Sequence, residues 1–318
     1  MSATLDQPSF GVDLISFYHP AFWSVSERKD LVDRAEAEPR WFWDRALESV
    51  RAAGIDGVEV CFPPGTWQSA LAAYGSEQGF VNALGSHQLS LISGFFMEPE
   101  VAGDVLDPAV QEEILRSGAD YARFLAACGG HVLVSGMPVL ERGEPGSETF
   151  LDLEYAKQVA DLMNRLGAVA KREGVKMAMH TEMGSVFCAR RDIDLFLMLT
   201  DPEFVTFCPD TGHITLAGSN PVDVLNDHYD RVSIMHWKDA TGAFNLDVPL
   251  DESRHAYYQD FFKQVGTGVV DWPGWARRLH DIQYGGWMIL ELDESPNPIP
   301  EMSAAREFAE GVLKENHA

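Results

Sequence analysis

Basic residues are scarce in this sequence. Its 318 residues include 24 lysines and arginines against 49 aspartates and glutamates, which gives a net charge of −25. A nucleic-acid partner is therefore disfavoured, because phosphate binding needs clustered lysine and arginine. The acidity indicates solubility and otherwise says little about the substrate.

Long apolar runs and paired cysteines are also absent. No segment is apolar for long enough to span a bilayer, and the first ten residues, MSATLDQPSF, lack the basic and apolar stretches of a secretory signal. The four cysteines form no C-x-x-C pair, and a disulfide framework is improbable in a chain of this size. These absences predict a cytoplasmic protein with reduced thiols and no membrane segment.

Strand-like and helix-like segments alternate along the whole chain. The stretches 41–54, 109–129 and 153–174 carry apolar residues at helical spacing, and several end at glycine. Eight such pairs predict an α/β fold of the (β/α)8 TIM barrel type, with an open doubly wound sheet as the alternative. No linker interrupts the pattern, so we expect one domain over residues 1–318. The predicted strands are 10–16, 56–62, 89–95, 131–136, 175–181, 204–209, 231–237 and 287–292.

Two segments are longer than a minimal barrel requires. They follow the first and the seventh predicted strands and cover residues 17–43 and 240–268. Both should lie on the face formed by the carboxyl ends of the strands, where barrel enzymes place their active sites. Their aromatic residues suit a lid, a sugar-stacking wall or an interface, and a packed surface extension is the alternative.

Four apolar runs in the second half of the chain end in residues that can bind a metal ion. His180, Asp210, His236 and Glu291 are separated by 30, 26 and 55 residues, so neighbouring strands can bring them to one rim. Taken singly, each histidine could be a hydrogen-bonded structural residue, Asp210 a helix cap and Glu291 a salt-bridge partner. Together they would be costly to bury unless they shared a cation. The mixed nitrogen and oxygen set suits one divalent ion, such as Mn²⁺, Co²⁺, Fe²⁺ or Zn²⁺.

Further polar residues accompany this set at short spacing. Glu182, Lys238 and Asp293 each lie two residues beyond a candidate ligand, and His213 lies three beyond Asp210. Residues two apart in a strand point to the same side, so we expect a second layer of side chains that reaches towards a substrate. Glu59 ends the second predicted strand and is a candidate either for substrate binding or for support of a ligand.

The sequence resembles the sugar phosphate isomerase/epimerase superfamily of xylose-isomerase-like TIM barrels. The motifs that carry the resemblance are Asp210-Thr211-Gly212-His213, His236-Trp237-Lys238-Asp239, the turn GTGVVDW at 266–272, and Glu291-Leu292-Asp293. The resemblance implies a metal ion held by Asp210, His236, Glu291 and one residue of the fifth strand, with Mn²⁺ as the first choice and Mg²⁺ also compatible. From these positions we expect Glu59, Trp237 and Asp293 to bind substrate.

The fifth strand departs from the commonest family pattern, E-x-H. Here the order is His180-Thr181-Glu182, followed by Met183-Gly184-Ser185, which is similar to the H-x-H-M-G-T stretch of inosose dehydratases. We align His180 with the ligand position and Glu182 with a catalytic one, and the reverse assignment stays open. Loss of one metal-bound carboxylate argues against epimerisation by two opposed bases. Elimination needs one base, for which Glu182 is suited, and an acid or oxyanion partner, for which Lys238 or His213 is suited.

The resemblance therefore implies a metal-dependent lyase that performs β-elimination next to a carbonyl. The substrate would be a keto-inositol that loses water, as in inosose dehydratases, or a 3-keto-glycoside that loses its aglycone, as in bacterial C-glycoside deglycosidases. The latter resemblance implies an oligomer with a small β-sandwich subunit. The alternatives are an aldose–ketose isomerase or keto-sugar epimerase, and a sugar-binding barrel without catalytic activity.

Overall fold

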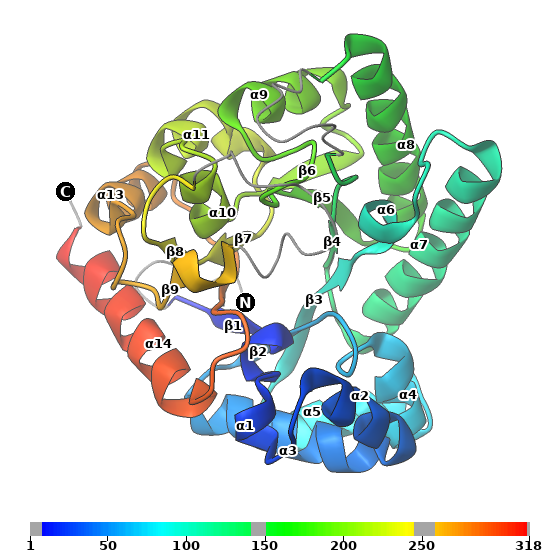
Figure 1. Cartoon of the computed structure of the whole chain (residues 1–318), viewed down its shortest axis with the longest axis vertical. Coiled ribbons are helices and arrows are strands. Elements are labelled where there is room, and N and C mark those ends of the chain that lie inside the picture. Colours follow the sequence, from blue (N-terminus) through cyan, green and yellow to red (C-terminus); the bar gives the residue numbers. More distant parts are fainter. Residues whose placement is uncertain (1–7, 141–150, 245–257, 317–318) are drawn as a thin grey trace.

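Eight parallel strands form the centre of the molecule. The structure, a computed structural model, describes residues 8–140, 151–244 and 258–316. The strand order is β6-β5-β4-β3-β2-β1-β10-β7, and bridges from Phe207 to Val232 and from Asp210 to His236 join the two ends (Figure 1). The sheet is thus a nearly closed barrel with helices around it, as predicted. The strands are β1 (Phe10–Asp13), β2 (Gly57–Val60), β3 (Ser90–Phe96), β4 (Val132–Ser135), β5 (Lys176–His180), β6 (Val205–Cys208), β7 (Met235–Trp237) and β10 (Met288–Leu290).

All eight predicted strands are present, but most are shorter than predicted. β1 ends at Asp13 because the carboxylate of this residue accepts the backbone N–H of Ile15 at 2.7 Å and caps a 3-10 helix, η1 (Leu14–Phe17). β7 begins at Met235 because the residues before it include a second 3-10 turn, η2 (Tyr229–Arg231). Side-chain capping and local turns therefore set the strand ends, and a prediction from hydrophobicity alone makes the strands too long.

The three helices predicted most clearly are α3 (Pro39–Ala52), α7 (Pro108–Cys128) and α8 (Leu153–Arg172). None of the helices in the three described ranges has the length and apolar character needed to cross a bilayer. The remaining helices around the barrel are α4 (Trp67–Tyr74), α5 (Glu77–Ser86), α6 (Glu98–Val101), α9 (Arg190–Leu199), α10 (Thr211–Leu216), α11 (Pro221–His228), α13 (Trp272–Asp281) and α14 (Pro298–Glu315).

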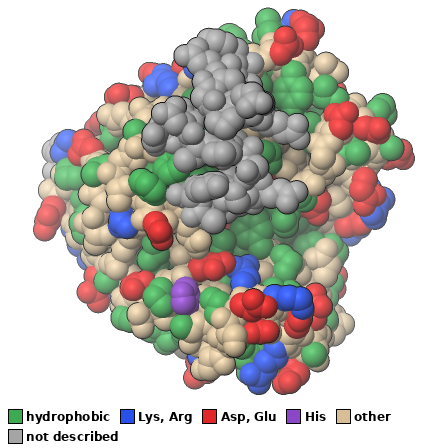
Figure 2. All heavy atoms as spheres, in the orientation of Figure 1, with side chains coloured by type: hydrophobic (Ala, Val, Ile, Leu, Met, Phe, Trp, Pro, Cys, Tyr) green, Lys and Arg blue, Asp and Glu red, His purple; other side chains and the backbone are tan. Residues whose placement is uncertain are grey.

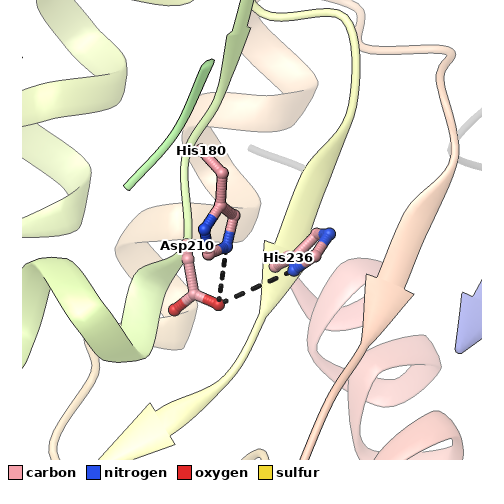
Figure 3. Close-up of side chains that lie close together, drawn as sticks. All are labelled: His180, Asp210 and His236. Atoms are coloured by element: carbon pink, nitrogen blue, oxygen red, sulfur yellow. Dashed lines mark ion pairs between the residues drawn. The ribbon is translucent and has the colours of Figure 1, made fainter. Parts of the chain in front are cut away.

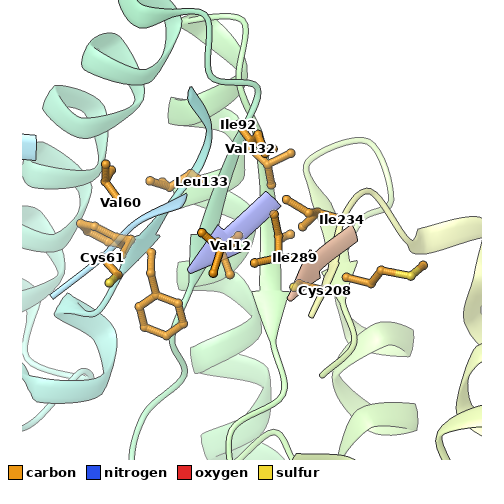
Figure 4. Packing of buried hydrophobic residues seen from close by; sticks show 14 of the residues in the cluster. Val12, Val60, Cys61, Ile92, Val132, Leu133, Cys208, Ile234 and Ile289 are labelled. Atoms are coloured by element: carbon orange, nitrogen blue, oxygen red, sulfur yellow. The ribbon is translucent and has the colours of Figure 1, made fainter. Parts of the chain in front are cut away.

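Apolar side chains from the strands fill the interior of the barrel. Val12, Ile92, Ile234 and Ile289 come from different parts of the chain and belong to one buried cluster (Figure 4). Gly57 on β2 leaves room for this packing, since a Cβ atom there would lie 2.0 Å from Ile92 Cδ1. The acidic residues and histidines of the barrel strands, by contrast, lie at or near the carboxyl ends; they are Asp13, Glu59, His180 and His236.

The long segment after β1 is a packed extension of the barrel wall. It contains two helices, α1 (Pro20–Trp23) and α2 (Arg28–Ala37), which precede α3. Trp23 is only 1% exposed, and its ring stacks on Phe42 with centroids 5.0 Å apart. Most aromatic side chains of residues 17–43 are thus buried, which agrees with the alternative that this segment is a packed surface extension.

The segment after β7 leaves the barrel and returns to it. Its outgoing part, β8 (Asp239–Ala240), pairs antiparallel with its returning part, β9 (Phe262–Lys263). Residues 245–257 of the predicted extension lie outside the described part of the chain. Figure 2 shows acidic and basic side chains side by side around the rim of this view of the molecule.

Candidate active site

Three of the predicted ligands lie together at the carboxyl ends of adjacent strands. His180 is the last residue of β5, Asp210 follows β6, and His236 lies in β7. One potential ligand atom from each lies within 4.8 Å of those from the other two. Asp210 Oδ2 is 3.7 Å from His180 Nε2 and 3.9 Å from His236 Nδ1, and both rings point towards it (Figure 3). The structure therefore brings these three predicted residues together.

This cluster has the properties of a divalent-metal site. His180, Asp210 and His236 are at most 2% exposed. His180 Nε2 and Asp210 Oδ2 have no hydrogen-bond partner among the described residues, although a buried polar atom without a partner is costly. Burial lowers the pKa of His180 and so favours the neutral imidazole, which is the form that binds metals. The donor set therefore fits a divalent metal ion.

Asp210 caps a helix with one oxygen and leaves the other facing the two histidines, although the sequence presented capping and metal binding as alternatives. Its Oδ1 accepts the backbone N–H of His213 at 2.8 Å and caps α10. Its own backbone N–H donates to Thr181 Oγ1, also at 2.8 Å. These bonds fix the carboxylate while Oδ2 faces the two histidine rings. Capping therefore does not compete with metal binding, because each role uses a different oxygen.

Glu291 lies beside this cluster and joins it to two further charged groups. Its Oε2 is 2.7 Å from His236 Nδ1, and its Oε1 accepts from Lys238 Nζ at 2.7 Å. Lys238 Nζ also donates to Asp293 Oδ1 at 2.6 Å. Burial alone would raise the pKa of Glu291, but Lys238 and His236 hold it well below its usual value. Glu291 is thus a carboxylate that can serve as a fourth ligand.

The charges of Lys238 and His236 are set by the groups that surround each of them. Burial alone would lower the pKa of Lys238, but Asp293 and Glu291 raise it well above its usual value, so the side chain is an ammonium. Burial raises the pKa of Asp293 to about 7, against the opposing effect of Lys238. Burial would also lower the pKa of His236, but Cys208 and Glu59 raise it well above its usual value. Metal binding at His236 would therefore displace a proton.

Glu182 and His213 lie on the other side of the cluster. Glu182 Oε2 is 3.5 Å from His180 Nδ1 and 3.4 Å from His213 Nε2. His213 Nδ1 accepts the backbone N–H of Met183 at 2.9 Å, so the neutral ring carries its proton on Nε2. Lys238 Nζ lies 3.4 Å from this same nitrogen. A carboxylate, an imidazole N–H and an ammonium are thus adjacent at the edge of the cluster of His180, Asp210 and His236.

The structure places Glu59 and Trp237 away from these reactive groups. Glu59 is fully buried, and its Oε1 lies 3.0 Å from His236 Nε2, the ring nitrogen opposite Glu291. This contact is the one expected of a residue that supports a ligand. Trp237 alternates with His236 along β7 and points the other way, where its indole stacks on Trp272 with centroids 4.8 Å apart. In the described structure, neither side chain contacts Glu182, His213 or Lys238, so neither takes the substrate-binding position that we expected.

Two residues of the site were missed from the sequence. Asp13 ends β1 next to Glu59 in register, and burial together with the charges of Glu59 and Glu291 raises its pKa well above the usual value. An acidic residue inside an apolar predicted strand was the available signal. Tyr258 reaches Glu182 from the segment after β7. No pattern of spacing or composition in the sequence indicates that Tyr258 belongs to the site, because its position depends on how the segment after β7 folds.

Known proteins similar to this chain share its fold and part of its sequence. The chain is 29% identical over 212 residues to inosose dehydratase of Clostridium perfringens. The matched region covers 62% of this chain and 70% of that protein. A xylose isomerase-like TIM barrel protein from Mycobacterium smegmatis, solved in complex with magnesium, has a TM-score of 0.72 and 15% identity over 99% of both chains. The IOLI protein, solved with a bound zinc atom, has a TM-score of 0.69 and 15% identity over 98% of this chain and 99% of that one.

These solved structures show a common fold at low sequence identity. The family model described as xylose isomerase-like TIM barrel matches residues 47–313, which include all the strands except β1. This match agrees with the motifs found in the sequence. The chain therefore belongs to the xylose isomerase-like TIM barrel family.

Proposed function

We propose that this protein is a metal-dependent lyase that eliminates a group β to the carbonyl of an oxidised cyclic polyol or sugar. The first choice of reaction is dehydration of a keto-inositol. The observation that carries the proposal is the juxtaposition of Glu182, His213 and Lys238 beside the cluster of His180, Asp210 and His236. The similarity to inosose dehydratases supports the choice of substrate class.

The proposed metal ligands are His180, Asp210, His236 and Glu291. Two carboxylates and two imidazoles would neutralise a divalent ion, and Mn²⁺ suits this mixed set. The ion, when bound, would supply positive charge that stabilises a developing negative charge on the carbonyl oxygen of the substrate. Glu59 would hold the ring of His236 in orientation through Nε2, from which it is 3.0 Å away.

Glu182 is the proposed base. It would take the proton from the carbon next to the carbonyl, and the electron pair of that C–H bond would form the new double bond as the C–O bond of the leaving group breaks. His213 carries a proton on Nε2 and lies close enough to the same region to give it to the departing oxygen, which leaves as water. The proton taken up by Glu182 then passes to His213 Nε2, which lies 3.4 Å from its Oε2, so both residues return to their starting states and no proton is gained or lost overall.

Lys238 is better suited to binding an oxyanion than to donating a proton. Its ammonium is held by Glu291 and Asp293 at 2.7 and 2.6 Å, which stabilises the charged form. A fixed positive charge in a buried site favours negative charge on a nearby substrate oxygen. Asp293, which is partly exposed, is placed by the same ammonium at the edge of the site, where it would bind a substrate hydroxyl.

The alternatives use the same residues in other ways. Cleavage of a 3-keto-glycoside follows the same elimination chemistry with an aglycone as the leaving group, and would involve a small β-sandwich partner. Epimerisation by two opposed metal-bound carboxylates is disfavoured, because His180 and not a carboxylate occupies the end of β5. A binding protein without catalytic activity would not need Glu182, His213 and Lys238 in contact beside a metal site.

Mass spectrometry of reaction mixtures tests the proposal. Purified protein of known metal content would be incubated with keto-inositols and 3-keto-glycosides, with added Mn²⁺ and after chelation. We expect metal-dependent loss of water or aglycone. Conversion of a substrate to a product of the same mass would indicate an isomerase or epimerase. The lyase proposal would be refuted if neither the keto-inositols nor the 3-keto-glycosides were converted.

Glu182→Gln provides the residue-level test of the same mechanism. It should retain metal and lose turnover, because glutamine cannot accept the proton. Glu113→Gln changes an exposed glutamate on α7 and serves as the matched control. Turnover by Glu182→Gln at the rate of the control would assign the base to another residue.

A further inference from the structure

Tyr258 contacts the proposed base directly. Its hydroxyl lies 3.3 Å from Glu182 Oε1 and 3.1 Å from the carbonyl oxygen of Met183, and it is placed to donate to either. The residue is 2% exposed, so water does not compete freely for the hydroxyl. A charged carboxylate is a stronger acceptor than a carbonyl group. The hydroxyl proton should therefore favour Glu182 whenever that residue is ready to act as a base.

The contact leaves the reactive side of Glu182 accessible to its other partners. Tyr258 binds Oε1, whereas Oε2 lies 3.4 Å from His213 Nε2 and 3.5 Å from His180 Nδ1. The two oxygens therefore have different neighbours, and rotation of the carboxylate would break contacts on both sides. A base must be held in a fixed geometry to accept a proton efficiently, and displacement by about 1 Å can be costly.

The path of the chain after β7 fixes the position of Tyr258. The residue lies four positions before β9, which pairs with β8 directly after Lys238. Asp239 anchors this return, because its Oδ2 accepts the backbone N–H groups of Gly266 and Gly268 at 3.0 Å and the indole N–H of Trp272 at 2.7 Å. Tyr258 thus lies a few residues before the part of the segment that these bonds hold in place.

A small apolar cluster closes around the ring of Tyr258. It consists of Met183, Cys188, Leu216, Ala240, Phe244, Tyr258 and Phe262 and is separate from the main core. Phe262 also lies against His213 and Lys238. Its ring centroid is 4.7 Å from that of His213, and Lys238 Nζ is 3.9 Å from it. The returning segment therefore contacts all three of the proposed reactive side chains.

We infer that Tyr258 is a positioning residue that orients Glu182 for proton abstraction, and that the segment after β7 supplies it to the active site. This inference rests on the proposed function of Glu182 as the base. Tyr258 acts through Glu182 and not on the substrate, so its loss should slow the proton-transfer step and leave substrate and metal binding nearly intact.

Tyr258→Phe tests the inference in the full-length, metal-loaded enzyme. We expect kcat to fall about ten- to a hundredfold with little change in KM, since a hydrogen bond to a charged group is lost. With substrate deuterated at the carbon next to the carbonyl, the primary isotope effect on kcat should increase, because proton abstraction becomes slower than the other steps. Tyr284→Phe is the matched control, since it also removes a hydroxyl that donates to a backbone carbonyl, at 2.9 Å, but one outside the site.

Two further measurements separate positioning from a purely structural role. In the Glu182→Gln background, addition of Tyr258→Phe should cause no further loss of the residual rate. In crystal structures, the carboxylate of Glu182 should be displaced in Tyr258→Phe and unchanged in Tyr284→Phe. This structural readout does not depend on the substrate, so it tests the inference even if no lyase activity is found, an outcome that would refute the proposed function alone.

Three results would overturn the inference. They are a kcat and isotope effect for Tyr258→Phe equal to those of Tyr284→Phe, a loss of activity that parallels loss of metal or of folded protein, and a carboxylate of Glu182 that does not move.

Discussion

Replacing Lys238 by methionine should destabilise the protein strongly while it is free of metal. The ammonium is 1% exposed and is the positive partner of Glu291 and Asp293, whose side chains are 8% and 15% exposed. Methionine keeps the apolar stem but removes the charge. Glu291 and Asp293 would then lie in a buried site without the cation that now contacts both of them.

The magnitude follows from the burial of this ion pair. Breaking a buried pair by removing one partner costs about 3–5 kcal/mol, because the remaining charge is left uncompensated. At about 2 °C per kcal/mol in a large domain, the melting temperature should fall on the order of 6–10 °C. The corresponding change at the exposed pair of Lys171 and Glu203, which are 49% and 66% exposed, should cost about 0–1 kcal/mol.

The assay is thermal unfolding of the wild type, Lys238→Met and the control Lys171→Met, each after chelation and again with excess Mn²⁺. A divalent ion beside Glu291 would replace part of the lost charge. We therefore expect the deficit of Lys238→Met to be largest after chelation and smaller with Mn²⁺, whereas Lys171→Met should behave like the wild type in both conditions.

Two results would refute this reasoning. If Lys238→Met unfolds at the same temperature as Lys171→Met after chelation, the buried carboxylates do not depend on the ammonium. If Mn²⁺ stabilises the wild type and Lys238→Met by equal amounts, the ion does not bind close to Glu291, and the proposed ligand set must be revised.

Three other predictions follow from the same structure. Asp210→Asn should keep its helix cap, because asparagine caps as well as aspartate, but should lose bound metal by elemental analysis; full metal content would exclude Asp210 as a ligand. Glu59→Ala should weaken metal binding about ten- to a hundredfold in calorimetric titrations, because His236 loses its orienting partner; unchanged affinity would leave Glu59 without that role. Gly57→Ala should lower the free energy of unfolding by about 1–3 kcal/mol in urea, because its Cβ would lie 2.0 Å from Ile92 Cδ1, and no loss would show that Ile92 has room to move.

The sequence was sufficient to predict the barrel because short apolar runs alternate with helical segments along most of the chain. It was sufficient to predict the cluster of His180, Asp210 and His236 because parallel strands of a barrel share one rim for their carboxyl ends. The order of the elements and the residue at each strand end are enough to predict that cluster, whatever the packing of the helices.

The order of the strands and the positions of their ends do not determine on which face of a strand a side chain lies. Trp237 sits between His236 and Lys238, and the alternation of side chains along β7 turns it to the opposite side. The position of Glu59 was predicted, but the sequence left its role open, because only the structure shows His236 Nε2 at 3.0 Å. Tyr258 depends on the return of a long segment, which no local pattern encodes.

The motif Asp210-Thr211-Gly212-His213 shows why its residue types occur together. One carboxylate oxygen of Asp210 caps α10, and the other faces His180 and His236. Thr211 Oγ1 accepts the backbone N–H of Lys238 at 3.0 Å and lies 2.6 Å from the carbonyl oxygen of the same residue, which ties the turn to the end of β7.

Gly212 completes this arrangement by allowing close approach. A Cβ atom there would lie 2.9 Å from both Cβ and Cγ of Lys238, so a larger residue would push the lysine away from Glu291. His213 then follows on the first turn of α10 and faces Glu182. The two motifs DTGH and HWKD are therefore one structural unit, in which the turn after β6 sets the position of the lysine after β7.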